Sequence, residues 1–481
     1  MVTDGRAMSS LKFGTSGLRG LVTELSDDVC FAYATAFIDH MKSAHGVASD
    51  AIILIGYDLR ASSPQMAAAC MAAAKHAGMR VENCGALPTP ALALRAQAIK
   101  SPAIMVTGSH IPADRNGLKF YRANGEIDKA DEAGISAMVD LAGVSTRDSS
   151  EYVAIKTTAY DDYLKRCVSI LRPNALAGMT IGVYQHSSVS RDLMIELVRT
   201  LGATAVPLGR SDVFVPVDTE ALRAEDVAFA KHACTAKLDA LISTDGDADR
   251  PLVADETGTF FRGDMLGVLT SKFLRASSVV TPVTSSSAVE LCGLFDSIVR
   301  TRVGSPYVIE GMAKAVAGGA KTVVGFEANG GVLLGSDVAV ADCILDALPT
   351  RDAMLPILAV LGLAAEAKVS VSKLLANMPE RFTQSGRIEH VGPELTGPFL
   401  NRLMDNATRE KHFATASAIA GFDAIDGVRV VLTSGDVVHY RASGNAPELR
   451  CYTEASDLVR AAELLAWGLS RAQASLDGAL C

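Results

Sequence analysis

The sequence has few of the features that mark secreted or membrane proteins. Its nine cysteines form no CxxC pair, and the closest two are Cys70 and Cys84, so neither a disulfide framework nor a zinc knuckle is indicated. The longest charge-free apolar stretch, residues 353–365, is 13 residues long and contains Pro356, whereas a membrane-spanning helix needs about 20. The first segment, MVTDGRAMSSLKFGTSG, has no apolar run of the secretory type. We therefore expect a soluble, cytoplasmic protein that has no membrane partner.

The sequence also lacks a block of basic residues. Lys and Arg total 45 against 54 for Asp and Glu, which gives a net charge of −9. An acidic chain without a basic cluster is a poor binder of nucleic acid, so we expect no nucleic-acid partner. A small anionic substrate is compatible with this charge, because it needs only a local basic pocket.

The length and the apolar content of the chain allow several large cores. Its 481 residues predict roughly three domains of about 150 residues each, and its 49% hydrophobic content excludes wholesale disorder. Residues 51–58 are predicted to form a buried strand and residues 62–78 the helix that follows it. Further strands are predicted at 101–108, 179–186, 238–244 and 320–327. Such alternation is typical of βαβ units, in which helices cover both faces of a sheet.

Three of these strands run directly into polar loops that contain glycine, at residues 107–117, 244–250 and 326–331. Ligands of open α/β sheets bind beyond the carboxyl ends of the strands, so the loops indicate three α/β units that face one cleft. From about residue 370 the pattern changes to alternating strands, which predicts an α+β unit. We expect an α/β fold with three α/β domains, which have mixed or parallel sheets, and a smaller C-terminal α+β domain. The expected domains are 1–150, 151–253, 254–370 and 371–481.

The loop with the most specific pattern contains Asp245, Asp247 and Asp249 at alternate positions. Three carboxylates in this spacing can converge on one hard cation, and a site of oxygen ligands suits Mg²⁺ or Mn²⁺ better than Zn²⁺. An EF-hand is an alternative, because Glu256 falls at the twelfth position, but Arg250 stands where the calcium loop needs Gly and the flanks are predicted to be strands. A solvated acidic turn is the other alternative.

Ser109 follows the predicted strand AIMV on a tight turn, where a hydroxyl can be presented to a cleft as covalent catalysis requires. Most serines in such turns only cap the backbone, so the pattern alone is weak. His110 suggests a Ser-His hydrolase, but adjacent side chains rarely face each other, and a structural role is the simpler interpretation. Lys119 is a cation that can reach the same cleft, or else a surface lysine.

Two other loops supply groups that bind anions or sugar hydroxyls. A phosphate cradle is predicted from two guanidinium groups, a hydroxyl, an amide and a turn that glycine permits: Arg441, Ser443, Gly444, Asn445 and Arg450. The alternative is a hairpin turn with surface arginines. Glu327 and Asn329 pair a carboxylate with an amide that can hold two sugar hydroxyls, or else close a strand. Together with a nucleophile and a hard cation, these groups indicate phosphoryl transfer on a sugar.

The chain resembles the α-D-phosphohexomutase superfamily, and most closely its bacterial phosphomannomutase/phosphoglucomutase branch. The resemblance covers essentially the whole chain and rests on motifs in the family's order: FGTSGLRG, GYDLRASS, LPTP, TGSHIPADRNGLKFY, DGDADR, FEANGG and RASGNAPELR. It implies four domains around a central cleft.

The resemblance also implies roles for single residues. Ser109 would carry a phosphoryl group, and the three aspartates, with Ser109, would bind Mg²⁺. Glu327 and Asn329 would read sugar hydroxyls, and the Arg441 loop would hold the phosphate that does not react. Arg19 and Lys119 would lie beside the transferring phosphoryl group, and Arg250 would flank the metal loop. His110 is a further catalytic candidate. Lys119 is expected to transfer a proton, which requires a lowered pKa in a cationic site.

The sequence departs from the family pattern at several positions. Gly108 and Ile111 stand where the common loop has Ala and Asn, and Ser305 stands where some relatives have His, so an acid/base role there is lost. Asn329 replaces the usual Ser of the sugar loop, as in acetylglucosamine phosphate mutases, and Asn445 replaces a Thr.

The resemblance implies a phosphohexomutase that interconverts the 1- and 6-phosphates of mannose or glucose through a phosphoserine, with glucose 1,6-bisphosphate or mannose 1,6-bisphosphate as activator. Its partners would be hexose phosphates, and the protein would be a monomer or homodimer. The alternatives are an N-acetylglucosamine phosphate mutase, a serine-dependent metal phosphatase and a sugar-phosphate binding protein without turnover.

Overall fold

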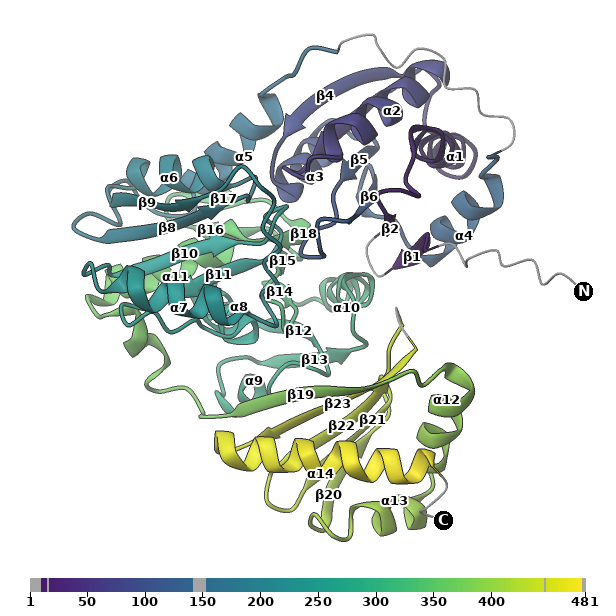
Figure 1. Cartoon of the computed structure of the whole chain (residues 1–481). Coiled ribbons are helices and arrows are strands. Elements are labelled where there is room, and N and C mark those ends of the chain that lie inside the picture. The colour runs from purple at the N-terminus through teal and green to yellow at the C-terminus, as the bar shows by residue number, and fades with distance from the viewer. Residues whose placement is uncertain (1–9, 15–16, 142–152, 445–446, 478–481) are drawn as a thin grey trace, which may run out of the picture.

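The computed structural model describes residues 10–14, 17–141, 153–444 and 447–477. Three sheets with their helices form the first, second and third parts of the molecule, which lie at the top and left of Figure 1. The C-terminal residues form a separate fourth part below them.

The first sheet is mixed. Its strands are β1 (Lys12–Gly14), β2 (Gly17–Leu21), β3 (Ile52–Tyr57), β4 (Arg80–Ala86), β5 (Ala103–Val106), β6 (Arg115–Arg122) and β7 (Gly125–Glu126). They are ordered β1-β2-β6-β5-β3-β4, with β7 beside β6, and β3 runs parallel to both β4 and β5. Helices α1 (Asp27–His45) and α2 (Ser63–His76) pack on one face, with α4 (Lys129–Met138) beside α1, and α3 (Thr89–Ala98) packs on the other face.

The second sheet has the order β11-β10-β8-β9. Its strands are β8 (Thr180–His186), β9 (Thr204–Arg210), β10 (Ala240–Thr244) and β11 (Pro251–Ala254), and its helices are α5 (Thr158–Val168), α6 (Arg191–Thr200) and α7 (Ala224–Cys234). The aspartate loop is the turn between β10 and β11, which are antiparallel neighbours. The flanks are therefore strands, and the EF-hand alternative, which needs two helices, is wrong.

The third sheet has the order β13-β12-β14-β15-β18. Its strands are β12 (Ser278–Pro282), β13 (Ser297–Thr301), β14 (Val323–Phe326), β15 (Val332–Leu334) and β18 (Leu348–Asp352), and β16 (Val338–Val340) pairs separately with β17 (Cys343–Leu345). Its helices are α8 (Gly263–Phe273), α9 (Ala288–Leu291), α10 (Ser305–Ala317) and α11 (Met354–Ala367), and the short 3₁₀ helix η1 (Val371–Leu375) follows.

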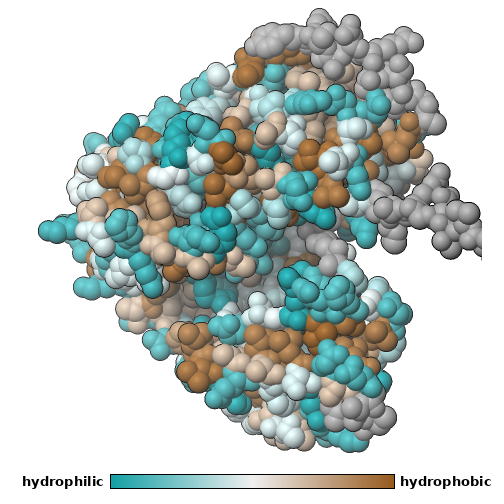
Figure 2. Space-filling model, viewed as in Figure 1, coloured by the Kyte–Doolittle hydropathy of each residue, from teal (hydrophilic) through white to brown (hydrophobic). Residues whose placement is uncertain are grey.

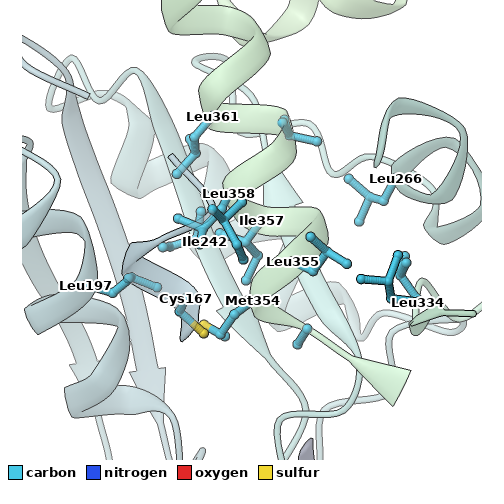
Figure 3. Packing of buried hydrophobic residues seen from close by; sticks show 14 of the residues in the cluster. Cys167, Leu197, Ile242, Leu266, Leu334, Met354, Leu355, Ile357, Leu358 and Leu361 are labelled. Atoms are coloured by element: carbon cyan, nitrogen blue, oxygen red, sulfur yellow. The ribbon is translucent and has the colours of Figure 1, made fainter. Parts of the chain in front are cut away.

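Helix α11 explains the charge-free stretch of the sequence. Its residues are buried all round among side chains of the second and third sheets, such as Ile242 of β10 and Leu334 of β15 (Figure 3). Each fully buried Leu or Ile side chain contributes about 1.5–3 kcal/mol of transfer free energy. The stretch is thus a core helix, and in the described part of the chain no helix is long and apolar enough to cross a bilayer.

The C-terminal part is an antiparallel sheet with helices packed against it. Its strand order is β19-β23-β22-β21-β20, and the strands are β19 (Phe382–Glu389), β20 (Ile419–Asp423), β21 (Val428–Leu432), β22 (Val437–Ala442) and β23 (Glu448–Ala455). The helices are α12 (Pro393–Arg402), α13 (Asn406–Phe413) and α14 (Leu458–Leu476). The surface is hollowed between this part and the body above it (Figure 2).

The expected fold class is confirmed, with three α/β sheets and a C-terminal α+β unit. Each expected strand forms within its predicted range, and the expected helix at 62–78 is α2. One apolar core runs through the first three parts without a break, so packing alone does not mark where one part ends. The expected domain boundaries, the cytoplasmic location and the oligomeric state stay predictions.

Candidate active site

Loops that follow β5, β10 and β14 meet at one buried site. Ser109 lies three residues after β5, Asp245 follows β10 directly, and Glu327 follows β14 directly. Ser109 is hydrogen-bonded to Asp245 of the aspartate loop. Arg351 of β18 donates hydrogen bonds both to Asp249 of that loop and to Glu327. The three loops that the sequence singles out therefore come together.

Ser109 is buried and held in a strained backbone conformation. Its φ of +53° lies in the left-handed region, which non-glycine residues rarely adopt, and its main-chain N–H donates to Thr107 Oγ1 at 2.8 Å. Its Oγ donates to Asp245 Oδ2 at 2.6 Å. Nδ1 of His110 lies 3.4 Å from the same Oγ, so the expectation that these adjacent side chains do not face each other is wrong.

Arg60 fixes the loop that carries Ser109. Its Nε donates to Asp58 Oδ2 at 3.1 Å, and its two terminal nitrogens donate to four main-chain carbonyls at 2.6–3.0 Å. These carbonyls belong to Ser109, Ile111, Pro112 and Arg115. All the N–H groups of this buried guanidinium are thus used, which only the planar fork of arginine allows.

Gly108 and Phe214 complete the surroundings of Arg60. A Cβ atom at position 108 would lie 2.7 Å from Arg60 Cζ, so the glycine makes room for the guanidinium. The ring of Phe214, from the second part, lies 3.9 Å from Cζ on the face of the guanidinium, in cation–π contact. The loop of Ser109 is therefore supported from both the first and the second part of the molecule.

The three aspartates lie together and are fully buried. Asp247 Oδ2 accepts from Thr89 Oγ1 at 2.7 Å and from Lys119 Nζ at 2.6 Å, and Asp249 Oδ2 accepts from Lys119 Nζ at 2.7 Å. The other oxygens, Oδ1 of Asp247 and Oδ1 of Asp249, are buried without a hydrogen-bond partner.

These unpartnered oxygens fit a cation. An unpaired buried carboxylate oxygen is costly, and a divalent ion bound by oxygen ligands removes that cost. Burial raises the pKa of Asp245 well above its ordinary value, and the carboxylates of Asp247 and Asp249 raise it further. The donor set suits Mg²⁺ or Mn²⁺.

The two nearest charged partners of Lys119 are carboxylates. Its ammonium bridges Asp247 and Asp249, and although burial lowers its pKa, these two carboxylates outweigh burial and raise the pKa above its ordinary value. The expectation of a lowered pKa at Lys119 is therefore wrong. The group is an ammonium that can neutralise negative charge or donate a proton, and it is not a ready base.

Three guanidinium groups lie beside the aspartates. Burial lowers the pKa of Arg19 to about 10, and the nearby positive charges of Arg250 and Arg351 add to the effect. Nε of Arg250 is buried without a hydrogen-bond partner, 3.7 Å from Asp249 Oδ1. Burial also lowers the pKa of His110, helped by Arg250 and Arg19, so this imidazole is neutral. Such a concentration of positive groups suits an anion such as a phosphoryl group.

Arg351 also holds the sugar loop that the sequence predicts. Its Nη1 donates to Glu327 Oε2 at 3.1 Å, while its Nε lies 3.1 Å from Asp249 Oδ2. Asn329 Nδ2 lies 3.5 Å from the same Glu327 oxygen, and Thr219 Oγ1 of the second part donates to the main-chain carbonyl of Asn329 at 2.7 Å. Glu327 and Asn329 are thus adjacent and buried, as two hydroxyl-binding groups need to be.

The C-terminal sheet contributes to a neighbouring cavity. Arg441 of β22 and Arg450 of β23 are directly opposite each other, and Arg441 Nε donates to Asp426 Oδ2 at 2.7 Å. Arg450 lines a cavity of about 300 Å³ between the C-terminal part and the third part, together with Ala328 of the sugar loop.

The phosphate cradle itself is only partly described. Ser443 and Gly444 follow β22, and Ser443 N donates to Glu448 O, but Asn445 lies outside the described residues. Arg450 of the cradle and Ala328 of the sugar loop line one cavity, and Arg351 joins the sugar loop to the aspartate group.

The sequence reasoning missed three residues of this site. Arg60 and Thr89 lie in the motifs GYDLRASS and LPTP, which were noted without a role for either side chain. Arg351 lies on β18 and follows no glycine-rich loop, so no local signal marks it.

Comparisons with known proteins agree along the whole chain. Four family models match: phosphoglucomutase/phosphomannomutase alpha/beta/alpha domain I at residues 10–142, domain II at 158–258, domain III at 262–382, and the C-terminal domain at 400–466.

Curated relatives match over nearly their full length. A phosphomannomutase of Sinorhizobium fredii is 46% identical over 474 residues, which cover 97% of this chain and 99% of that protein. A phosphomannomutase of Salmonella muenchen is 42% identical over 98% of this chain and 97% of its own. A phosphoglucosamine mutase of Symbiobacterium thermophilum is 28% identical over 94% of this chain and 97% of its own.

Solved structures share the fold. A phosphoglucomutase/phosphomannomutase family protein from Burkholderia thailandensis superposes with a TM-score of 0.74 at 20% identity, covering 96% of this chain and 97% of that one. An N-acetylphosphoglucosamine mutase of Aspergillus fumigatus in complex with glucose 1,6-bisphosphate gives a TM-score of 0.59 at 15% identity, covering 99% and 96%.

Proposed function

The chain belongs to the phosphoglucomutase/phosphomannomutase family and is a phosphohexose mutase, and from this premise we propose that it interconverts mannose 1-phosphate and mannose 6-phosphate. Glucose phosphates are the second substrate pair in this proposal. The reaction runs through a phosphoserine at Ser109 and a hexose 1,6-bisphosphate.

One observation carries the assignment of Ser109. Its buried hydroxyl donates to Asp245 at 2.6 Å, inside a group of three aspartates of which two have an unpartnered oxygen. A hydroxyl in this position can exchange a phosphoryl group beside a divalent ion, because phosphoryl transfer depends mainly on positioning and on neutralisation of charge.

Each half-reaction breaks one P–O bond and forms another. The bond between Ser109 Oγ and phosphorus breaks, the free hydroxyl of the hexose phosphate forms the new bond and loses its proton, and Oγ regains one. The bisphosphate then reorients within the site, and its other phosphoryl group is transferred to Oγ. Lys119 and Arg19 neutralise charge on the transferring group, and His110, whose Nδ1 lies 3.4 Å from Oγ, is the proposed proton carrier.

The carboxylates of Asp245, Asp247 and Asp249 would hold Mg²⁺. When it is bound, the ion supplies Lewis-acid stabilisation of the phosphoryl oxygens. Glu327 and Asn329 bind sugar hydroxyls, while Arg441, Ser443, Gly444, Asn445 and Arg450 anchor the phosphate that does not react.

The choice of mannose follows the relatives. The phosphomannomutases are 42–46% identical to this chain, whereas the phosphoglucosamine mutase is 28% identical. The Glu-x-Asn sugar loop is the observation that favours an N-acetylglucosamine phosphate mutase as the second candidate.

The test combines coupled assays on the 1-phosphates of mannose, glucose and N-acetylglucosamine with intact mass measured before and after glucose 1,6-bisphosphate is added. We expect turnover of mannose 1-phosphate and a gain of one phosphoryl group that is absent from Ser109→Ala. Release of inorganic phosphate and free sugar, without formation of the 6-phosphate, would identify a phosphatase, and binding without turnover or phosphorylation would identify a binding protein. Either result would overturn the proposal.

A further inference from the structure

A second group of metal-ligating side chains lies outside the active site. His40 and His45 of α1 and Asp131 of α4 place one ligand atom each within 4.8 Å of one another. Nε2 of His40 and Nε2 of His45 lie 3.0 and 2.7 Å from the same oxygen, Oδ1 of Asp131. The two helices lie side by side at the upper right of Figure 1. We propose that this trio is a site for a transition-metal ion such as Zn²⁺, Co²⁺ or Ni²⁺.

The distances are close to those of a coordinated set. Zn²⁺ binds imidazole nitrogen and carboxylate oxygen at about 2.0–2.2 Å, which places tetrahedral ligand atoms about 3.3 Å apart. A movement of a few tenths of an ångström therefore opens the space for an ion. Both imidazoles then bind through Nε2 as neutral rings, with their protons on Nδ1.

The carboxylate is already oriented for this role. Oδ2 of Asp131 accepts from the main-chain N–H of Asp128 at 3.0 Å and lies 3.2 Å from Arg122 Nη1. Oδ1 is therefore turned to the histidines and is the oxygen available to an ion. Metal-ligating carboxylates are commonly held in this way by donors on their second oxygen.

Gly134 is a second sign that α4 is shaped around the trio. A Cβ atom at this position would lie 2.3 Å from Cε1 of the His40 ring and 2.5 Å from its Nδ1. A glycine inside a helix costs about 1 kcal/mol relative to Ala. Here it lets α4 approach the buried imidazole closely.

The chemistry separates this site from the aspartate group. Two imidazoles and one carboxylate favour ions of intermediate softness such as Zn²⁺, whereas oxygen ligands alone favour the hard ion Mg²⁺. His45 is part-exposed, with a side-chain accessibility of 34%, so the site has an entry path and room for water as a further ligand. The ion would tie the end of α1 to the start of α4.

The experiment titrates the chelator-treated full chain with Co²⁺ in saturating Mg²⁺, which fills the aspartate site. We expect one Co²⁺ per chain, with the visible absorption of a nitrogen-ligated ion, and its displacement by Zn²⁺. His45→Gln removes a part-exposed ligand and is expected to abolish this absorption, and Arg122→Gln to weaken Co²⁺ binding about 10- to 100-fold. His232→Gln, at an exposed histidine of α7, is the control that should bind like the wild type.

Circular dichroism and mutase activity check that the variants fold, and both should be unchanged in His45→Gln. Absence of Co²⁺ uptake by the wild-type chain, or equal uptake by His45→Gln, would overturn the proposal.

Discussion

The guanidinium of Arg351 is bonded to one oxygen of Asp249: its Nε and Nη2 lie 3.1 and 2.9 Å from Oδ2. Arg351 lies on β18 of the third sheet and Asp249 in the loop between β10 and β11 of the second, and both residues are buried. The second arm of the same guanidinium reaches Glu327. One side chain thus fixes the position of the aspartate loop relative to the sugar loop, and this relationship leads to the first prediction.

Arg351→Lys should keep the positive charge but lose the planar guanidinium whose separate N–H groups bind Asp249 and Glu327 at the same time. We expect kcat to fall by at least tenfold, because the two loops are then no longer held in register. Steady-state kinetics on mannose 1-phosphate check this. Arg172→Lys, at an exposed arginine, is the control, and equal kcat values for the two variants would contradict the role of Arg351.

Ser109→Ala should abolish mutase turnover and leave the fold intact, because it removes one oxygen from a buried turn and no main-chain hydrogen bond. Intact mass after incubation with glucose 1,6-bisphosphate should show no added phosphoryl group. Ser136→Ala, at an exposed serine of α4, should behave like the wild type. Ordinary turnover by Ser109→Ala would show that another residue is the nucleophile.

Asp247→Asn should remove the response to Mg²⁺. The amide oxygen of the new Asn can still accept the hydrogen bond from Thr89 Oγ1. However, the change removes one carboxylate from the group that would hold the ion, and it weakens the interaction with Lys119. In the wild type, Mg²⁺ should raise the temperature of thermal unfolding, because a ligand that binds only the folded chain stabilises it. An Mg²⁺-induced shift of the same size in Asp247→Asn would exclude this site.

Arg441→Ala should chiefly weaken substrate binding. One charge-assisted hydrogen bond is worth about 1.5–3 kcal/mol, which corresponds to a rise in KM of roughly 10- to 150-fold. Substrate-saturation curves check this, with Arg402→Ala, an exposed residue of α12, as the control. A wild-type KM would be inconsistent with the cradle.

Asp264 should make stability depend on pH in the acid range. Although burial raises its pKa, the ion pair with Arg262 and the main-chain N–H of Ser286 outweigh burial, so the folded pKa lies below its ordinary value. The resulting stabilisation is present above the unfolded pKa of about 3.9 and is lost as pH falls through the folded pKa. Asp264→Asn should unfold at lower denaturant concentration at pH 7, and the difference from the wild type should shrink toward pH 3. Asp212→Asn, at an exposed aspartate, should show no such convergence.

The sequence predicted the parts of the fold and site that local patterns determine. The ends of β5, β10 and β14 could be located because an apolar strand there runs into a polar loop, and Ser109, Asp245 and Glu327 follow from that change. The antiparallel C-terminal sheet follows in the same way from alternating strands.

Long-range contacts could not be predicted in this way. Arg60 contacts carbonyls about 50 residues away, and Arg351 reaches Asp249 across 102 residues, so neither partner is visible in a local window. The ion pairs of Lys119 have the same origin, which is why its environment was expected to be cationic when two carboxylates surround it. The trio of His40, His45 and Asp131 also depends on the packing of α1 against α4.

The bonds of the aspartate loop have a mechanical consequence. Thr89 and Ser109 tie it to the first part and Arg351 ties it to the third, so three of the four parts are cross-linked at one buried loop. Separating these pieces would strip partners from every aspartate at once. The C-terminal part does not share this loop: it is attached to the third part through other hydrogen bonds, such as those of Ser287 to Glu454 and of Val303 to Asp426.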